Sequence, residues 1–377
     1  MSHSSQVRDT TDASSALYVA LELSGSTWKL GFLADAGSAK PRIRTIEAGA
    51  VEQLQAEIGK AKRRLKLPEE AAVRSCYEAG RDGFWVHRML EQLGVSNVVI
   101  DPASIEVERK KRTSKTDRLD AIKLVTRLVR YHSGEPRVWS VVRVPTEEQE
   151  DARRLHRERE RLLKEKKQHI SRIQSLLAAH GPVPKKLKDA TWKRWDGSPL
   201  PADLRAELER EQARLDVVLE QLRTVEKERD RRIEEDSTPA AEMTRLLASL
   251  RGIGSTSAWF LVAEVYGWRP YENRRRAGSL VGLTGTPFDS GGAAREQGIS
   301  KAGSGRIRSL LVELSWLWLR YQPQSELSRW FYERWAGSSR TRRIGIVAMA
   351  RRLFIDLWRL VEHGLVPPGA DFKPVTA

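Results

Sequence analysis

Four acidic side chains have the types and the spacing of a divalent-metal site. Glu22 ends the first predicted strand, and Glu78 follows a later one. Asp117 and Asp120 lie three residues apart in KTDRLDA (115–121), so they share one face of a predicted helix. Mg²⁺ prefers carboxylate oxygens, and two such ions can stabilise the attacking and leaving oxygens at a phosphodiester. The four acids therefore predict phosphodiester chemistry assisted by Mg²⁺.

Each acid taken singly also has an ordinary structural explanation. Glu22 could be a partly buried acid with a partner, and Asp120 could be a helix-surface residue paired with Lys123. Basic residues outnumber acids between 101 and 131, and Lys115 and Arg118 lie within the acidic motif itself. Carboxylates in a basic stretch suit a metal-held phosphate, so we expect these two cations to contact nucleic acid.

A serine in the segment GLTGTPFDSGGAAREQGISKAGSGRIR (282–308) is a candidate nucleophile. Ser290 precedes two glycines, and a serine can attack phosphorus and hold a strand covalently. Cations after it could neutralise charge on the phosphate; they are Arg295, Lys301, Arg306 and Arg308. The alternative is a plain glycine-rich turn, because no histidine lies nearby in the sequence to act as a base.

Two further features suggest contact with nucleic acid. Gly252-Ile253-Gly254 separates two predicted helices and resembles a helix-hairpin-helix, whose main-chain N–H groups can meet a phosphate. Trp192 and Trp195 lie among basic residues, where aromatic rings can stack on unpaired bases. A tight helical corner and core packing are the structural alternatives.

Composition agrees with a polyanionic partner. The 377 residues carry a formal net charge of +16 and a pI near 10.0, which favours capture of nucleic acid. The single cysteine, Cys76, excludes an internal disulfide and Cys-based zinc sites. The polar start is no signal peptide and no apolar run approaches a membrane span, so we expect a cytoplasmic, nucleoid-associated protein.

Hydrophobic periodicity predicts an α/β domain followed by α-helical parts. Strands near 16–23, 28–33, 72–77 and 95–100 alternate with helices near 49–66, 83–93 and 115–131. Long charged helices at 147–178 and 202–235, broken by Gly and Pro, predict an antiparallel hairpin or coiled coil. The expected organisation is a disordered segment 1–15, an α/β domain 16–140, a helical hairpin 146–236, a mostly helical domain 240–365 and a loose tail 366–377.

Taken in order, these motifs resemble bacterial insertion-sequence transposases of the insertion-sequence-110 type. The shared features are an acid after the first strand, Tyr77-Glu78-Ala79-Gly80, the KTDxxDA helix, and the late GLT…SGG…ISKAG segment. The resemblance covers about 16–355 and includes the helical hairpin and the GIG turn.

The resemblance implies a RuvC-like, RNase H-type fold for the first domain, with a DEDD metal site made of Glu22, Glu78, Asp117 and Asp120. It implies that Ser290 forms a covalent phosphoserine link to DNA. It also implies homo-oligomers (dimers or tetramers) with composite sites from different subunits, and a structured bridge RNA that selects target and donor DNA. The sequence departs from the family pattern at Glu22, where aspartate is usual, and at Ala293-Ala294, where basic residues are common.

The sequence is also compatible with three other functions. A metal-dependent nuclease of the junction-resolving kind would use the acids alone, with Ser290 as a turn residue. A catalytically lapsed nucleic-acid-binding protein would bind without cutting. A scaffold built on the long helices would leave the acidic pattern unexplained.

Overall fold

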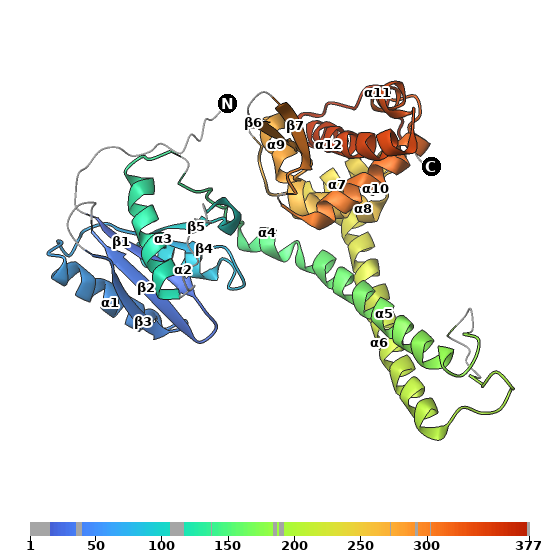
Figure 1. Cartoon of the computed structure of the whole chain (residues 1–377), viewed down its shortest axis with the longest axis horizontal. Helices are drawn as coiled ribbons and strands as arrows, with labels where there is room; N and C mark the ends of the chain where they lie inside the picture. The colour runs from blue at the N-terminus through green and yellow to red at the C-terminus, as the bar shows by residue number, and fades with distance from the viewer. Residues whose placement is uncertain are drawn as a thin grey trace. The chain divides into compact units, whose positions relative to one another are not determined.

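The computed structural model describes residues 16–34, 40–105, 117–136, 138–183, 187, 192–271, 273–290, 293–301 and 303–374, with the main chain alone at 117, 279, 286–290 and 293–297. These residues form two compact units, which divide between Pro145 and Thr146 (Figure 1). The predicted disordered segment 1–15 and Lys115 lie outside the described residues.

A mixed five-stranded sheet in the order β3-β2-β1-β4-β5 is the centre of the first unit. Its strands are β1 (Leu17–Leu23), β2 (Thr27–Leu33), β3 (Arg42–Glu47), β4 (Val73–Glu78) and β5 (Ser96–Ile100). β1, β2 and β3 form an antiparallel meander, whereas β4 and β5 run parallel to β1. The alternation of strands and helices expected from the sequence is confirmed.

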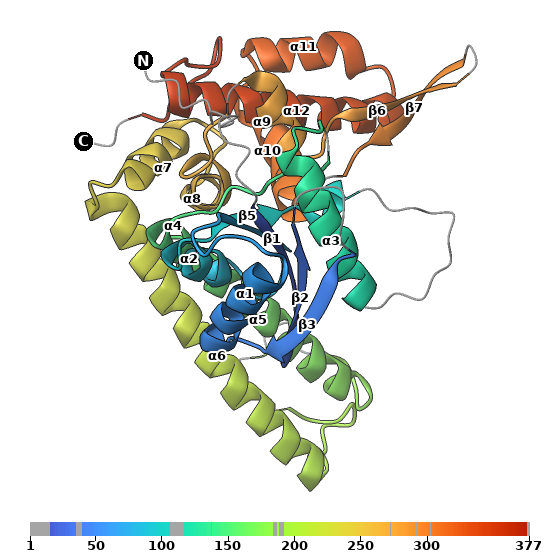
Figure 2. The ribbon, with the colours of Figure 1, turned by 90° about the vertical axis from the view of Figure 1, so that its left-hand side faces the viewer.

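Helices cover both faces of this sheet (Figure 2). α1 (Val51–Arg64) and α2 (Trp85–Gln92) pack on one face, where Leu54 and Leu90 meet Leu17, Leu21 and other strand residues. α3 (Asp117–His132) packs on the other face through Leu124, Val125 and Leu128. Central strands covered on both faces must be apolar on both, which explains the continuous hydrophobic run of β1.

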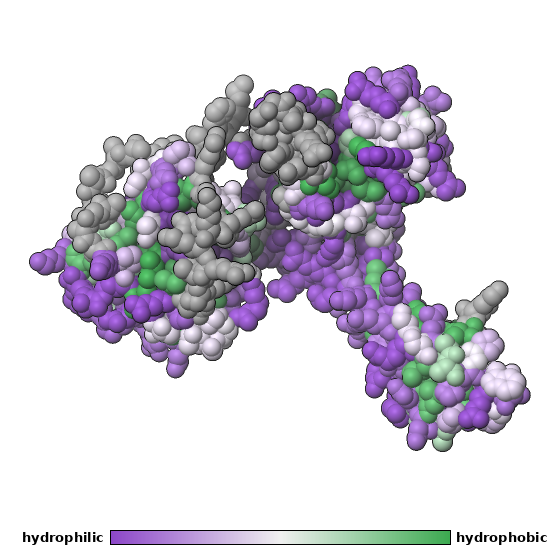
Figure 3. Space-filling view, viewed as in Figure 1, coloured by the Kyte–Doolittle hydropathy of each residue, from purple (hydrophilic) through white to green (hydrophobic). Residues whose placement is uncertain are grey.

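Two long helices, α5 (Arg154–Ala178) and α6 (Ala202–Glu235), lie side by side in the second unit. Leu208, Leu215, Val218 and Leu222 form the apolar seam of α6. Hydrophilic side chains cover most of the length of this pair, and apolar side chains gather at the end where α5 leads into α6 (Figure 3). The predicted single helix over 147–178 is interrupted, since α4 (Glu147–Asp151) ends before α5 begins.

The remaining helices of the second unit share one core. They are α7 (Pro239–Ser249), α8 (Ser255–Leu261), the wider turn η2 (Val262–Tyr266), α9 (Arg274–Leu280), α10 (Gly305–Tyr321), α11 (Glu326–Trp335) and α12 (Ser339–His363). Trp318, Phe331 and Phe354 are fully buried in that core. A two-stranded hairpin, β6 (Gly285–Ser290) and β7 (Ala293–Ile299), lies between α9 and α10 in the chain. No described helix has the length and apolar character of a membrane span.

The C-terminal segment does not behave as the loose tail predicted from about Pro367. Lys373 donates its main-chain N–H to Ser249 O at 2.7 Å and its Nζ to Ile253 O at 2.7 Å. The Gln322 amide donates to Asp371 O and accepts from Asp371 N, both at 2.7 Å. Residues 371–373 are therefore fixed against the turn that follows α7, up to the last described residue, 374.

Candidate functional site

Glu22 and Glu78 lie at the same edge of the sheet because β1 and β4 are parallel neighbours. The last paired residues are Leu21 and Tyr77, and each glutamate comes one position later. Both line a pocket of about 360 Å³ whose other polar residues include Ser24, Arg81 and Asp82. The structure therefore brings two of the four predicted acids together.

These glutamates occupy the face of the sheet that α3 covers. Side chains alternate along a strand, and Ala20 and Cys76, two positions earlier, both pack in the α3 core. Complete burial, with a smaller contribution from the negative charge of Glu78, raises the pKa of the Cys76 thiol well above its usual value. The thiol is therefore protonated, and Cys76 serves packing rather than chemistry.

α3 is oriented with its acidic N-terminal end toward the same edge of the sheet. A Cβ on Gly31, the cross-strand partner of Ala20, would lie 2.8 Å from Ala121 O, whereas the His132 ring lies 5.8 Å from that of Tyr18. α3 thus runs opposite to β1, and its first turn lies toward the Glu22 end of the strand. Asp120, one residue before Ala121, lies in that turn.

The motif on α3 is only partly described. The Asp120 side chain is 22% exposed, and one of its oxygens lies 3.8 Å from Lys123 Nζ. This ion pair is the contact that the alternative explanation anticipated. Arg118 is exposed, whereas the Asp117 side chain lies outside the described atoms.

The donor set suits a hard divalent cation, but it is incomplete where the structure describes it. Two carboxylates from adjoining strands, in an open pocket that can admit waters and phosphates, match the way Mg²⁺ is commonly held. Among the described side chains, no group of three or more His, Cys, Asp or Glu residues is close enough to hold a metal. A third carboxylate could come from the first turn of α3 or from Asp82, which lines the same pocket.

Two cations near the acids were not anticipated from the sequence. Lys29 is the cross-strand partner of Glu22 and lies on the same face of the sheet. Arg81 lines the pocket, and its guanidinium lies 3.6 Å from an oxygen of Asp82. The predicted turn between β1 and β2 could have indicated Lys29, because a turn length fixes the cross-strand register.

Ser290 ends β6, at the tip of the β6–β7 hairpin. Its register partner is Ala293, and Phe288 pairs with Arg295. The side chains of Ser290 and Arg295, and all of residues 291–292, lie outside the described atoms. Ser290 belongs to the second unit, whereas the acids belong to the first.

The remaining predicted cations follow this hairpin. Lys301 is exposed, with φ +55°, and Arg308 donates to Gly303 O at 3.2 Å. Arg306 lies 3.3 Å from His156 Nε2 and forms an ion pair with Glu160. Arg306 therefore lines a different pocket, beside α5.

The GIG turn is packed at its first two residues and open at its third. Gly252 has φ +86°, and a Cβ there would lie 3.3 Å from Leu317 O, so its packing requires glycine. Ile253 is buried and its carbonyl accepts the Lys373 bond. Gly254 precedes α8 and has open space around it, so of the two predicted glycines it is the one accessible to a ligand.

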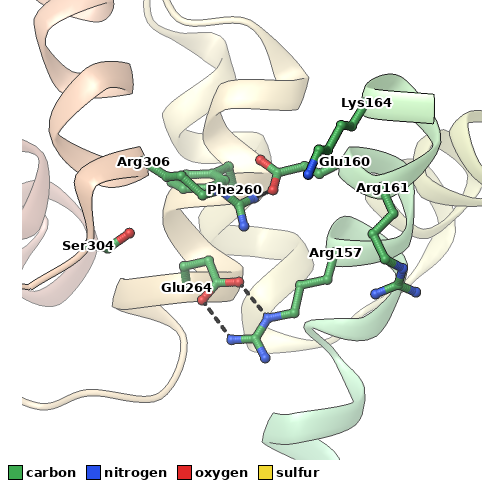
Figure 4. A pocket seen from close by; sticks show the side chains of 8 residues that line it. All are labelled: Arg157, Glu160, Arg161, Lys164, Phe260, Glu264, Ser304 and Arg306. Carbon is green, nitrogen blue, oxygen red and sulfur yellow. Dashed lines mark hydrogen bonds and ion pairs between the residues drawn. The ribbon is translucent and has the colours of Figure 1, made fainter. Parts of the chain in front are cut away.

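The described residues also form a basic pocket of about 600 Å³, to which Arg306 is the predicted cation that contributes (Figure 4). Arg157, Glu160, Arg161 and Lys164 line it from α5, and Phe260, Glu264, Ser304 and Arg306 from later elements. The recurrence of charge at positions i, i+3, i+4 and i+7 along α5 was a local signal, but it equally describes a solvated helix face.

A strongly basic chain whose acids gather at one edge of a sheet has the characteristics of an enzyme that acts on nucleic acid. Residues 244–329 match the family model described as Transposase IS116/IS110/IS902 family. A Sinorhizobium fredii protein named as a transposase, y4rJ, is 38% identical over 95% of this chain and 95% of its own length. The chain therefore belongs to the IS116/IS110/IS902 transposase family, whose members are DNA-cleaving and strand-transferring enzymes.

Two relatives from other bacteria are transposases of named insertion sequences. The transposase of IS1533 from Leptospira borgpetersenii is 27% identical over 69% of this chain and 72% of its own length. The transposase of IS1328 from Yersinia enterocolitica is 26% identical over 78% and 84%, respectively. The resemblance found from the motifs alone is confirmed at the level of the family.

Proposed function

We propose that this transposase cuts and rejoins DNA with Ser290 as the nucleophile and with a divalent ion, Mg²⁺, held by Glu22, Glu78, Asp117 and Asp120. The observation that carries the proposal is the pairing of Glu22 and Glu78 in one pocket at the ends of adjacent parallel strands. The direction of α3, which turns Asp120 toward that edge, supports it. The strand order supports a RuvC-like fold for the first unit.

The proposed cleavage step exchanges one phosphate ester bond for another, so the energy of the broken bond is kept in the serine–DNA link. The Ser290 hydroxyl loses its proton and forms a bond from Oγ to phosphorus, while a phosphorus–oxygen bond of the strand breaks and the leaving sugar oxygen takes a proton. Joining is the reverse attack by the hydroxyl of another strand, which restores the serine. No water, nucleotide or oxidant is consumed.

The residues around these groups have separate roles. The paired glutamates offer carboxylate oxygens, and a bound divalent ion would stabilise charge on the phosphate oxygens. Lys115, Arg118 and Arg295 are proposed phosphate contacts, together with Lys301 and Arg308. We further propose that a structured bridge RNA selects the DNA and that the protein acts as a homo-oligomer; both proposals rest on the family resemblance.

A denaturing gel tests the nucleophile. Wild-type protein, labelled DNA that spans the ends of the element, RNA transcribed from its flank, and Mg²⁺ should give a slow-moving protein–DNA adduct. Ser290→Ala should give none. Ser309→Ala is the matched control, because among the described residues that exposed hydroxyl donates to Gly305 O alone, within its own helix.

The same gel separates the competing functions. Free cut ends without an adduct in the wild-type reaction would support a metal-dependent nuclease in which Ser290 is a turn residue. Binding without cutting would support a protein that has lost its metal site at Glu22. An adduct that persists in Ser290→Ala would assign the nucleophile to another residue, and reactions without RNA test the guide.

A further inference from the structure

The basic pocket of the second unit is built by three parts of the chain that are distant in sequence. α5 contributes one face of its helix, α8 and η2 contribute Phe260 and Glu264, and the first turn of α10 contributes Arg306 (Figure 4). Ser304 caps α10 by accepting from Ile307 N at 3.5 Å. The positive end of a 17-residue helix therefore borders the pocket.

Both acids of the pocket are already engaged with arginines. Glu264 accepts two bonds from Arg157, at 2.9 and 3.1 Å, and Glu160 forms an ion pair with Arg306. These pairs fix two guanidinium groups in place but also neutralise them.

Arg161 and Lys164 are the two cations that remain. Both are exposed and line the pocket, and neither has a hydrogen bond or ion pair to any described residue. Figure 4 shows their side chains extending from the same helix that carries Arg157 and Glu160. The pocket thus has a surplus of about two positive charges, because four cations face two carboxylates.

The buried imidazole beside Arg306 does not add to the charge of the pocket. His156 is buried, with its ring 4.7 Å from that of Phe260. Burial, against the opposing effect of Glu264 and with smaller contributions from Arg306 and other nearby arginines, lowers the pKa of His156 to about 4. Burial, followed by the charge of Arg157, also lowers the pKa of the Arg306 guanidinium. The surplus charge is therefore crowded, and an anion would relieve it.

We propose that this pocket binds a backbone phosphate of a nucleic-acid strand through Arg161, Lys164 and the first turn of α10. The proposal rests on the function proposed above, which supplies the polyanion, and assigns it a contact away from the Ser290 hairpin tip. A phosphodiester fits because its charge is exposed on two oxygens that ammonium, guanidinium and main-chain N–H groups can approach together. The pocket volume of about 600 Å³ admits a sugar-phosphate segment.

The test compares two double substitutions that remove equal charge from the same helical pair. Arg161→Ala/Lys164→Ala empties the pocket of its unpaired cations. Arg223→Ala/Lys227→Ala is the control, because these exposed α6 residues are outside the pocket and have no described partner. Binding of a labelled 30-base-pair duplex DNA and of a labelled 30-nucleotide hairpin RNA is measured against NaCl concentration with EDTA present, so that no cutting occurs.

Loss of two phosphate contacts lowers the slope of log K against log salt by roughly 2 on duplex DNA and weakens binding on the order of tenfold or more at 0.1 M salt. We expect this change for the pocket variant and not for the control. If the salt slope and the affinity change for only one of the two nucleic acids, that nucleic acid is the one the pocket binds. Either result supports the proposal. Pocket and control variants that match each other on both nucleic acids would overturn it.

Two measurements distinguish a lost phosphate contact from misfolding of the variant and from failure of the proposed chemistry. Thermal melting of both variants should match wild type, because the substituted side chains are exposed; Arg161→Gln/Lys164→Gln replaces the alanine variant if melting differs. Failure of the proposed chemistry would appear instead as a missing Ser290 adduct, which the EDTA binding assay does not measure.

Discussion

Glu22 has one methylene more than the aspartate that the family resemblance implies, and this methylene moves the carboxylate by roughly a bond length, against a tolerance of about 0.5 Å in a well-held site. Glu78, on the adjoining strand, lies in the same pocket. Two carboxylates side by side repel each other, and a bound cation relieves that repulsion. The metal should therefore affect stability as well as chemistry.

We expect MgCl₂ to raise the melting temperature of the wild-type protein but not that of Glu22→Gln. Preferential binding to the folded state at ten times the dissociation constant stabilises it by about 1.4 kcal/mol. Without Mg²⁺, Glu22→Gln removes both the repulsion from Glu78 and the attraction of Lys29, so the shift that MgCl₂ causes is compared with the melting temperature of the same variant in its absence. Differential scanning calorimetry at several MgCl₂ concentrations gives both quantities.

Glu47→Gln is the matched control for that measurement. Glu47 is exposed on β3, at the edge of the same sheet but outside the pocket lining. An equal Mg²⁺ response in wild type and both variants would show that the metal binds elsewhere and would remove Glu22 from the proposed ligand set.

α3 lies close against β2 at Gly31, where no side chain separates the helix from the strand. A Cβ on Gly31 would lie 2.8 Å from Ala121 O, closer than side-chain atoms normally approach a carbonyl. The position of the KTDxxDA helix therefore depends on a residue that makes no polar contact with the acids.

Gly31→Ala should push α3 away from the sheet. We expect a loss of roughly 1–3 kcal/mol in the free energy of unfolding, as for other overpacked interiors, together with slower strand cutting. Urea unfolding and the denaturing gel measure the two effects. Gly59→Ala in α1 is the control: only the end of Arg63 is near, and alanine in a helix interior should stabilise. Unchanged stability and cutting in Gly31→Ala would mean that α3 is not positioned by this contact.

The α5–α6 pair contains a buried acid that affects its pH response. Glu211 is 2% exposed and is hydrogen-bonded to His169 Nδ1 at 2.7 Å, Arg214 Nη1 at 2.8 Å and Arg172 Nη1. Desolvation raises the pKa of this carboxyl, but the three hydrogen bonds together outweigh it and leave the pKa below its usual value. Stability from Glu211 is therefore present above about pH 4.5 and is lost as pH falls through the lowered pKa.

Glu211→Gln should lower stability at pH 7 by roughly 2 kcal/mol, a reduced figure for a buried ion cluster because both arginines are half exposed. The difference from wild type should shrink toward pH 3, where the wild-type carboxyl gains a proton. Chemical denaturation monitored by circular dichroism at both pH values checks this, with Glu207→Gln as an exposed control on α6. A difference that stays constant with pH would contradict the cluster.

Sequence periodicity predicted the elements with a strong hydrophobic pattern and missed those without one. β1 and β5 are apolar runs between turns, and the strand pairing that brings Glu22 to Glu78 follows from parallel connections. β3 was missed because only Ile46 of its six residues is buried, as expected of an edge strand. The β6–β7 hairpin lacks alternation and contains Pro287 and Gly298, so the sequence did not predict strands in this mostly helical domain.

Other features depend on contacts between distant residues. The break between α4 and α5 has no Pro or Gly to mark it, and Arg153, at the break, is buried with its guanidinium 4.5 Å from the Trp268 ring. Of the two tryptophans expected to stack on bases, Trp192 packs in the hairpin core and Trp195 is 79% exposed. Local composition is the same around both, so only the fold distinguishes them.

The proposed acids and the proposed nucleophile belong to different compact units. The acids lie before Pro145 and Ser290 after Thr146, with one chain connection between the units. A site that needs both can take them from one chain or from two. The family resemblance favours two chains, in which each metal centre works with the serine of a partner subunit.

Mixed oligomers distinguish these cases. Glu22→Gln and Ser290→Ala proteins, each inactive alone, are co-expressed with different tags and the oligomers that carry both tags are purified. Random pairing makes about half of all dimers mixed. If each site combines the acids of one chain with the serine of the other, a mixed dimer has one site with both intact. The unfractionated mixture then regains about a quarter of wild-type sites. Sites built within one chain regain none.

If sites are shared between chains, the covalent adduct should reappear in the doubly tagged fraction and join DNA to the Glu22→Gln chain, which retains Ser290. Absence of adduct from that fraction, with wild-type oligomers active under the same tags, would place acids and serine in the same chain.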